Sequence, residues 1–369
     1  MALAETADAT RPAPPLARAD ADAPDWERLA RAGRRTLLTR RIALVTFLTL
    51  VSVPILLPFF WVLVISLSAR TGGVETAVLW RACAVLVPVA LLYLGAHTVL
   101  ESVRARLLAG LLALAAATFG LWAMVGADIH FDNFRFLFDP NVVEGMRGAA
   151  TASGQFPWVW EAFAGSLIVA ITSMAVKVSV AALAGYYVSR FAFPGRASFL
   201  QGLLILEVFH PWMLTIPIFL VIFWVGLLNT LAGPILVLSV IDLPFFIFIM
   251  KGFFDAVPWD IEMAAMADGA TRRQAFRTVV LPQVKGGLIA ISVLAFIRGW
   301  EEYVFVTALR TGNSYWVMST YLYYVAEDVM GVDYGLVAAV SVLYILPSLV
   351  LYLALQRYLT QLSLGGVKG

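Results

Sequence analysis

Long apolar runs recur along this chain of 369 residues, and they constrain its fold more than any other feature. Hydrophobic residues make up 61% of the sequence and charged residues only 14%. A typical soluble domain has about 25% charged residues. Runs of about 20 apolar residues are long enough to cross the hydrocarbon core of a bilayer as helices. The sequence therefore predicts an all-α polytopic membrane protein.

Eight runs are candidate transmembrane helices. The fifth contains Pro211 and Pro217, so we expect it to be kinked or broken. The predicted spans are Ile42–Leu67, Ala82–Leu100, Leu107–Ala127, Phe163–Tyr187, Phe199–Leu227, Leu231–Met250, Gly286–Val306 and Leu336–Leu355.

The distribution of basic residues predicts the orientation of these spans. With a cytoplasmic N-terminus, nineteen Lys and Arg residues fall on the cytoplasmic side and five on the external side. Because cytoplasmic loops carry the excess of positive charge, we expect both termini in the cytoplasm.

The segments outside the spans are short. Residues 1–41 mix Ala, Pro, Asp and Arg and are expected to form a disordered, basic cytoplasmic segment. Its part "DWERLARAGRRTLLTR" is either an amphipathic helix on the membrane surface or a solvated basic flank. No cleaved signal peptide is predicted, and Cys83, the single cysteine, excludes an internal disulfide. The other divisions are three N-terminal spans, an external segment, a core and a cytoplasmic tail (42–127, 128–162, 163–357 and 358–369).

The segment between the sixth and seventh spans contains "MAAMADGATRRQAFRTVVLP", which is too polar to cross a bilayer. Pro258 suits the first turn of a helix, with Asp260 and Glu262 near its positive N-terminal end. We expect this helix to run to about Asp268, where Gly269 supplies a left-handed C-terminal cap.

A second helix is predicted after this glycine. Thr271 and Gln274 have the spacing of a capping box, and we expect Pro282 to end the helix. One face of it carries Phe276, Val279 and Val280.

Three interpretations of this loop, residues 251–285, fit its pattern. It is a plain connector, a DNA-binding helix-turn-helix, or a docking element for a soluble partner. Arg272, Arg273 and Arg277 are too few, and too close to the membrane, to favour DNA.

The spacing of Gly269, Val279 and Leu281-Pro282 resembles the cytoplasmic signature of binding-protein-dependent ABC importer permeases. "DGA" at 268–270 and "LPQVKGGL" at 281–288 are similar to the carbohydrate-uptake, maltose-type branch. The resemblance covers roughly residues 160–369. Further matching segments are "RFAFPGR", "GLLNTLAGPILV", "DLPFFIFIMKGFFDAVP", "GWEEYVF" and "QRYLTQLSLGGVKG".

The resemblance implies the fold and the partners. The fold would be a six-helix permease core, made of the last five spans and one N-terminal span, with two extra spans. The partners would be an ABC ATPase homodimer that holds ATP and Mg, a second homologous permease subunit and an extracytoplasmic solute-binding protein. The location would be the bacterial cytoplasmic (inner) membrane, and the cargo a sugar, oligosaccharide or polyol.

The residues themselves predict no catalytic or cofactor site. The dipeptide Gly-Lys of a phosphate-binding loop is absent from the sequence, and the three histidines lack the spacing of a metal site. We therefore expect a non-enzymatic transport subunit that binds neither cofactor, metal nor nucleic acid.

The resemblance also implies which residues contact the ATPase. One position departs from the family, because Met263 stands where the signature has a glutamate; either the contact is apolar, or Glu262 or Asp260 takes it over. The predicted docking residues are Asp260, Glu262, Met263, Ala264, Ala265, Asp268, Gly269, Leu281 and Pro282. The predicted tail contact is Gly365, Gly366, Val367, Lys368 and Gly369.

Four charged residues fall inside predicted spans, where a charge is costly and marks either a pair or a transport pathway. From their depths we expect two neutralising pairs, Lys177 with Glu207 and Asp242 with Arg298. Direct substrate contact and a water-filled cavity stay open. A proton-coupled secondary transporter that uses these charges as a relay is the rival function, and a membrane-bound enzyme is a third class.

Trp300, Glu301 and Tyr303 are the candidate substrate contacts. Trp300 and Tyr303 carry aromatic rings of the kind that stacks on a sugar face. Packing in the core or in an aromatic belt is the alternative for these rings.

Overall fold

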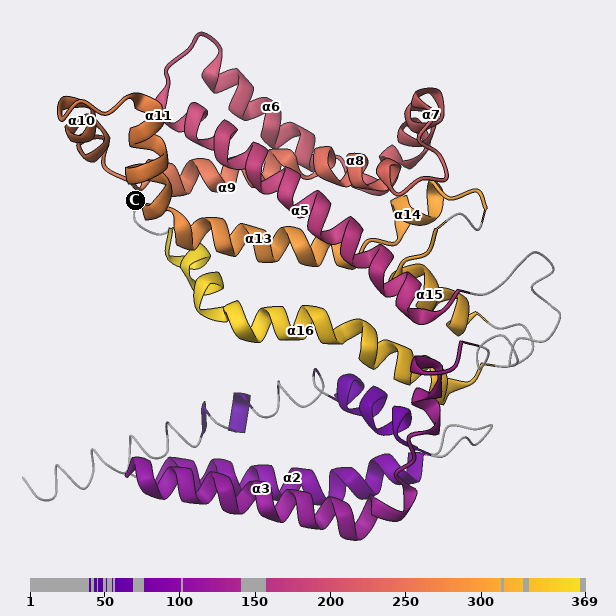
Figure 1. The fold of residues 1–369 in the computed structure, drawn as a ribbon. Coiled ribbons are helices and arrows are strands. Elements are labelled where there is room, and N and C mark those ends of the chain that lie inside the picture. Colours follow the sequence, from indigo (N-terminus) through magenta and orange to yellow (C-terminus); the bar gives the residue numbers. More distant parts are fainter. Residues whose placement is uncertain are drawn as a thin grey trace, which may run out of the picture. The chain divides into compact units, whose positions relative to one another are not determined.

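The computed structural model describes residues 57–68, 76–100, 102–140, 157–312, 315–327 and 332–365, with Arg40 and a few positions between 43 and 55. The regular elements of these residues are all helices (Figure 1). By its contacts the chain divides into two compact units, residues 80–127 with 1–59, and residues 60–79 with 128–369. Of the predicted N-terminal segment, residues 1–41, all but Arg40 lie outside the described residues.

The first unit contains a helical hairpin. It is formed by α2 (Thr76–Val99), from Trp80 onward, and α3 (Val103–Val125) (Figure 1). Ser102 caps α3 by accepting a hydrogen bond from the Ala105 N–H at 3.1 Å. A Cβ atom on Gly120 would lie 2.6 Å from Val85 Cγ1, so a larger residue at this position would push the two helices apart.

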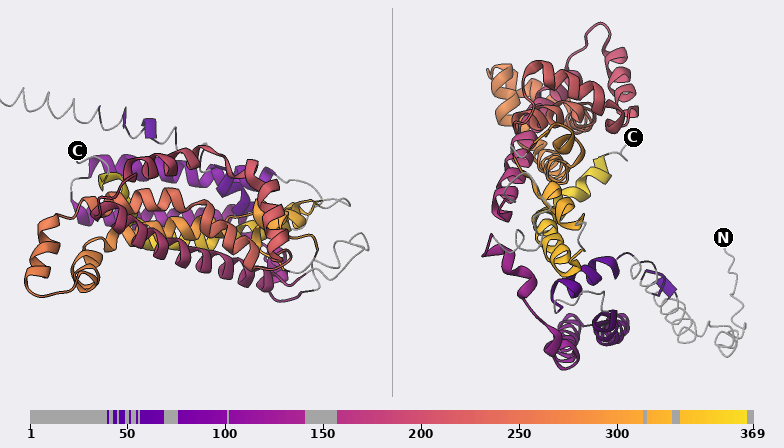
Figure 2. Two further views of the ribbon diagram at one scale, coloured as in Figure 1. Left: turned by 90° about the horizontal axis from the view of Figure 1, so that it is seen from above. Right: turned by 90° about the vertical axis from the view of Figure 1, so that its right-hand side faces the viewer.

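The second unit is built around α5 (Val159–Arg190), a helix of 32 residues without proline. It packs against α8 (Ala232–Ile241), α9 (Leu243–Asp255) and α13 (Lys285–Trp300) (Figures 1 and 2). Gly185 makes the contact with α9 possible, because an added Cβ would lie 2.8 Å from Met250 Cβ. α16 (Tyr334–Gly365) packs against α13 on the other side.

The fifth and sixth predicted spans are each bent at a break. The fifth consists of α6 (Arg196–Val208), a 3₁₀ turn, η5 (Pro211–Leu214), and α7 (Thr215–Val225), with a bend of 89°. This break was expected from Pro211, whose ring cannot continue the preceding helix. The break in the sixth span, 48° between α8 and α9, was not expected; it falls at Asp242, immediately before Leu243-Pro244.

Among the described residues, four helices are long and apolar enough to span a membrane, or up to seven if each bent pair counts as one span. The seventh predicted span divides into α13 and α14 (Val304–Ala308), since the helix stops at Trp300. α15 (Met318–Ala326) lies between the seventh and eighth predicted spans.

A buried asparagine joins two distant segments of the second unit. The Nδ2 atom of Asn133, in η3 (Asp132–Leu137), donates to Ser66 O at 3.1 Å and Ser68 O at 2.9 Å. These carbonyls end the helix 57–66 and lack an intrahelical donor, so Asn133 satisfies backbone groups that would otherwise be unpaired.

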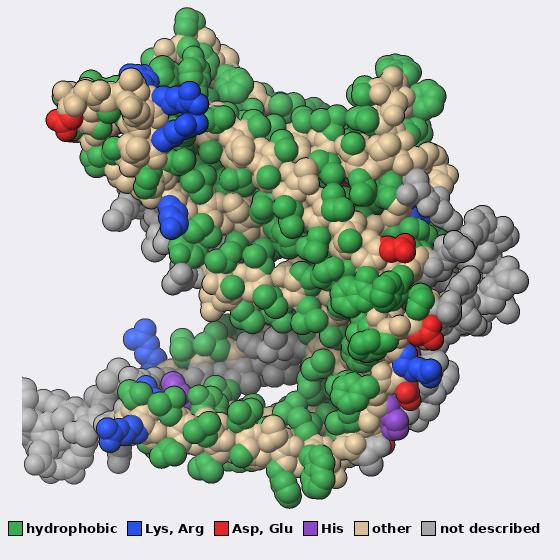
Figure 3. Space-filling model, in the orientation of Figure 1, with side chains coloured by type: hydrophobic (Ala, Val, Ile, Leu, Met, Phe, Trp, Pro, Cys, Tyr) green, Lys and Arg blue, Asp and Glu red, His purple; other side chains and the backbone are tan. Residues whose placement is uncertain are grey.

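The surface of the second unit suits a bilayer. Apolar side chains cover most of the face of its helices seen in Figure 3, and charged side chains gather towards the helix ends. Such a continuous apolar surface is costly in water but not in lipid. Exposed Arg272, Arg273 and Arg277 lie on the loop that follows α9 and α10.

Candidate functional site

The polar loop folds as two helices hinged at a glycine, as predicted. α10 (Trp259–Ala267) begins after Pro258 and ends at Asp268, its C-cap. Gly269 has φ +95°, a left-handed conformation that residues with a Cβ rarely adopt. No atom lies within 4 Å of the place where its Cβ would stand. Glycine is therefore needed here for its backbone and not for space.

The second helix also begins where predicted. Thr271 caps α11 (Arg272–Ala275), and Gln274 Oε1 accepts from the Thr271 N–H at 2.8 Å, which completes the capping box. A π-helical turn, η6 (Phe276–Val280), follows. Ala275 and Val280 are buried, so this face packs inward.

Pro282 does not end the second helix, which corrects the sequence-based expectation. It occupies the first turn of α12 (Leu281–Gln283), where its missing N–H costs no hydrogen bond. The wider π turn before it accommodates the ring. The chain bends instead at Val284, by 74°, before α13 begins.

Glu262 is buried inside the protein, so it cannot be the exposed docking carboxylate that was one of the alternatives. Its side chain is 0% exposed. Glu262 Oε1 accepts from the Tyr186 hydroxyl at 2.5 Å, and Oε2 lies 3.2 Å from Arg190 Nε. The second contact is an ion pair without hydrogen-bond geometry, since both of its atoms lack a hydrogen-bond partner among the described residues.

The large hydrophobic side chains that the loop exposes all lie on α10. Met263 is 43% exposed, and Trp259 and Ile261 are also exposed large hydrophobic residues. The other predicted docking residues differ in exposure: Asp260, Ala264, Asp268, Gly269 and Pro282 are exposed, while Ala265 and Leu281 are half-buried.

Arginines brace this loop against the end of α5. The Arg190 guanidinium donates to Val257 O at 2.8 Å and lies 5.3 Å from the ring centre of Trp259. Arg272 stands over the rings of Phe191, at 4.7 Å, and Trp259, at 5.9 Å. Such stacking uses the flat guanidinium to hold two segments together.

The buried charges form one cluster, not two pairs. Asp242 bonds both Lys177 Nζ, at 2.7 Å, and Arg298 Nη1, at 2.9 Å. The predicted pair of Lys177 with Glu207 is wrong. Glu207 is exposed on α6, and Lys177 Nζ bonds Asp242 instead.

Exposure differs within this cluster. Lys177 has a side chain that is 0% exposed and Asp242 one that is 11% exposed, whereas that of Arg298 is 42% exposed. Asp242 precedes α9 as its N-cap, where the helix dipole also favours a negative charge. One carboxylate thus faces two cations, and the side chain of Arg298 stays partly exposed at the surface.

Trp300 is a core residue and not a substrate contact, which corrects another expectation. Its side chain is 1% exposed, and its indole N–H donates to Tyr344 O at 3.0 Å. Its ring stacks at 6.0 Å on both Phe296 and Tyr344. Glu301 is exposed, and Tyr303 is half-buried beside Tyr323, with ring centres 5.1 Å apart.

Tyr323 lies on α15 and donates from its hydroxyl to Glu327 Oε1 at 2.5 Å. This hydrogen bond, together with desolvation, raises the pKa of Tyr323 to about 12. The phenol therefore stays protonated at neutral pH.

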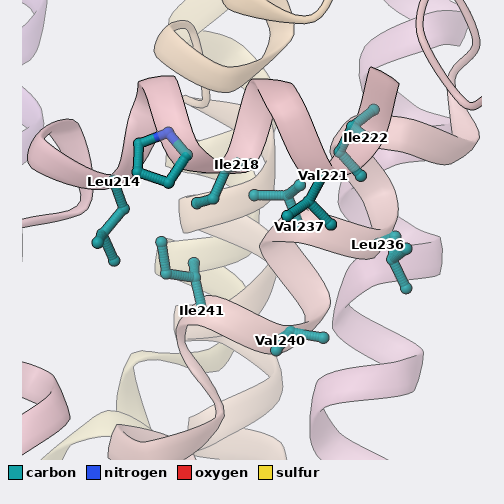
Figure 4. A pocket seen from close by; sticks show the side chains of 9 residues that line it. Leu214, Ile218, Val221, Ile222, Leu236, Val237, Val240 and Ile241 are labelled. Atoms are coloured by element: carbon teal, nitrogen blue, oxygen red, sulfur yellow. The ribbon is translucent and has the colours of Figure 1, made fainter. Parts of the chain in front are cut away.

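An apolar groove of about 380 Å³ opens between α7 and α8 (Figure 4). Its walls carry only hydrophobic side chains, so it offers no hydrogen bond to a sugar hydroxyl or an ion. The lining residues are Leu214, Pro217, Ile218, Val221, Ile222, Leu236, Val237, Val240 and Ile241.

Tyr186 and Arg190 were not predicted as functional candidates. Their spacing of four residues places them on one face of a helix, and this was the signal available to find them. Of the predicted tail contact, Gly365 is the last residue of α16, and Gly366, Val367, Lys368 and Gly369 lie outside the described residues.

Comparison with known proteins identifies the class of this chain. Residues 196–362 match the family described as binding-protein-dependent transport system inner membrane component. The diacetylchitobiose uptake system permease protein DasC of Streptomyces coelicolor is 31% identical over 66% of this chain and 82% of its own. The diacetylchitobiose uptake system permease protein NgcG of the same organism is 32% identical over 53% of this chain and 65% of its own.

A solved structure shares the fold. It is a bacterial ABC transporter involved in the import of the acidic polysaccharide alginate, with a TM-score of 0.60 and 19% identity over 86% of this chain and 95% of that chain. The sequence matches and the helical architecture thus point to the same class of protein. The chain is a multi-pass inner-membrane protein that belongs to the family of binding-protein-dependent transport system inner membrane components.

Proposed function

We propose that the chain is the permease subunit of an ATP-driven importer, and that its loop 258–282 docks onto a separate ATPase dimer. The observation that carries this proposal is the geometry of the loop. Two capped helices are hinged at Gly269 and braced by Arg190 and Arg272, and the first of them, α10, exposes apolar side chains. A plain connector has no need of such rigidity.

The docking contact is apolar in this proposal. Met263 is exposed at the position where the family resemblance places a glutamate, while Glu262 is engaged inside the chain. A flexible thioether suits an irregular apolar groove of a partner. The family membership favours ATP-driven import over a proton-coupled transporter, whose mechanism gives this loop no role.

The cargo in this proposal is a sugar, oligosaccharide or related polyol, delivered by an extracytoplasmic binding protein and passed between this chain and a second permease subunit. DasC and NgcG, which are named for diacetylchitobiose uptake, support the carbohydrate class. Glu301 and Tyr303 remain candidate contacts. Both termini would lie in the cytoplasm, with the tail 365–369 reaching between the ATPase subunits.

Reconstitution of the purified complex tests the proposal. The chain is tagged in its native host, and the proteins that co-purify with it are placed in proteoliposomes with the cognate binding protein. A thermal-shift screen of that binding protein against carbohydrates selects the labelled substrate. We expect uptake that requires both ATP and the binding protein. Uptake driven by a proton gradient without ATP would support the rival function instead.

A further inference from the structure

Glu262 faces inward because α10 is fastened to the last turn of α5. The Tyr186 hydroxyl and the Arg190 guanidinium, which both come from α5, reach its two carboxylate oxygens. The Tyr186 ring also packs against Phe276 of the second helix, with 4.4 Å between ring centres. Both halves of the loop are therefore attached to the same end of α5.

The same helix is fastened a second time, deeper in the unit. Lys177 of α5 bonds Asp242 at the break between α8 and α9, and Asp242 also bonds Arg298 of α13. Lys177 and Arg190 are 13 positions apart, or roughly 20 Å along a helix. No proline interrupts α5. One stiff helix thus joins the loop to the charge cluster.

The covalent route from the loop into α13 is less direct. The chain passes through the π turn and then bends by 74° at Val284. Irregular turns of this kind yield more easily than a packed helix.

We infer that α5 carries the movement of the loop 258–282 to the break between α8 and α9. Glu262 is the positioning residue that fastens α10 to α5. This inference rests on the proposed function and adds the route by which movement of the loop reaches the charge cluster. Lys177 passes the displacement of α5 to Asp242, and Asp242 passes it to both halves of the broken span and to α13.

The test measures docking and coupling separately. Glu262→Gln keeps the size of the side chain and removes the charge that Arg190 faces. We expect the ATPase to co-purify as with the unaltered chain, and ATP hydrolysis to continue. Sugar uptake per ATP hydrolysed should fall about tenfold, within the usual range of coupling between distant sites. Lys177→Met should have the same effect, since Asp242 retains Arg298.

Lys251→Gln is the matched control. Lys251 pairs with Asp255 at the same end of the unit, and both residues lie on α9. Asp255 also accepts from the Ser189 hydroxyl of α5 at 2.6 Å, and Lys251→Gln leaves that bond in place. This variant should leave uptake per ATP unchanged. Tyr186→Phe removes only the hydroxyl donor and serves if Glu262→Gln folds poorly; we expect a smaller fall in the same ratio.

Two further variants separate a positioning role from general damage. The exchange Glu262→Arg with Arg190→Glu should raise uptake per ATP above that of Glu262→Gln. The double variant Glu262→Gln with Lys177→Met should be no worse than either single variant, because both residues act on one helix.

The inference is overturned if Glu262→Gln keeps normal uptake per ATP, or if the two losses multiply in the double variant. Loss of the ATPase from the Glu262→Gln complex would also overturn it, because Glu262 would then act in docking. Failure of the unaltered chain to bind any ATPase would instead contradict the proposed function.

Discussion

Glu262 and Asp242 are both buried carboxylates held by side chains of α5, yet they are neutralised differently. Glu262 has one cation and one neutral phenol, and no part of the group is open. Asp242 has two cations, one of them 42% exposed. The loop 258–282 therefore buries its carboxylate on the inner side and presents Met263 outward, whereas the charge cluster leaves the side chain of Arg298 partly exposed. Removing the carboxylate of Asp242 should therefore act on stability, whereas substitutions on the exposed face of the loop should act on docking and coupling.

The largest effect should come from Asp242→Asn. This change leaves Lys177 buried without a counter-charge, and removing one partner of a buried pair costs about 3–5 kcal/mol. We expect a strong loss of folded protein, measured as the thermal midpoint and yield in detergent. Replacing Asp242 together with Lys177 by Asn and Met should recover part of that loss. An unaltered midpoint for Asp242→Asn would show that the cluster does not stabilise the break.

Gly269→Val should break the loop and leave the spans intact. The left-handed conformation at φ +95° strains a β-branched residue, by roughly 1–3 kcal/mol. We expect the second helix to be misdirected and uptake to be abolished, with normal membrane insertion. Gly252→Val is the control, since Gly252 lies within α9 and also has no atom near its added Cβ. Normal coupling of ATP hydrolysis in Gly269→Val would contradict the role of the hinge.

Met263→Glu tests the outer side of the loop. If the partner has an apolar socket, the added carboxylate is buried there without a counter-charge, and we expect ATPase retention to fall about tenfold, or 1.4 kcal/mol. Met263→Leu should retain the ATPase. Stronger retention with glutamate would show that the partner has kept a site for a carboxylate.

Arg298→Gln should have the smallest effect on stability. Asp242 keeps its bond to Lys177, and a half-exposed pair contributes about 1 kcal/mol or less. We expect a thermal midpoint within a few degrees of the unaltered chain. A loss as large as that of Asp242→Asn would remove the distinction between the closed and the open side of the cluster.

Local features were predictable from the sequence, and partners across the fold were not. The caps at Gly269 and Thr271 and the break at Pro211 depend on neighbouring residues, and the structure has them where expected. The partner of Lys177 depends on how α8 and α9 pack against α5, which no local pattern states. The same limit applies to Glu262, because its environment is set by residues of α5 more than 70 positions away.

The π-helical turn Phe276–Val280 affects the direction in which the side chains of α10 point. The Leu281 N–H donates to Phe276 O, five residues back, so this turn holds one residue more than an α-helical turn would. Each residue of an α-helix advances the direction of its side chains by about 100°. A loop one residue shorter here would therefore point Met263 about 100° away from its present direction relative to α13. The number of residues in this turn, independent of their side chains, therefore sets the direction in which α10 points.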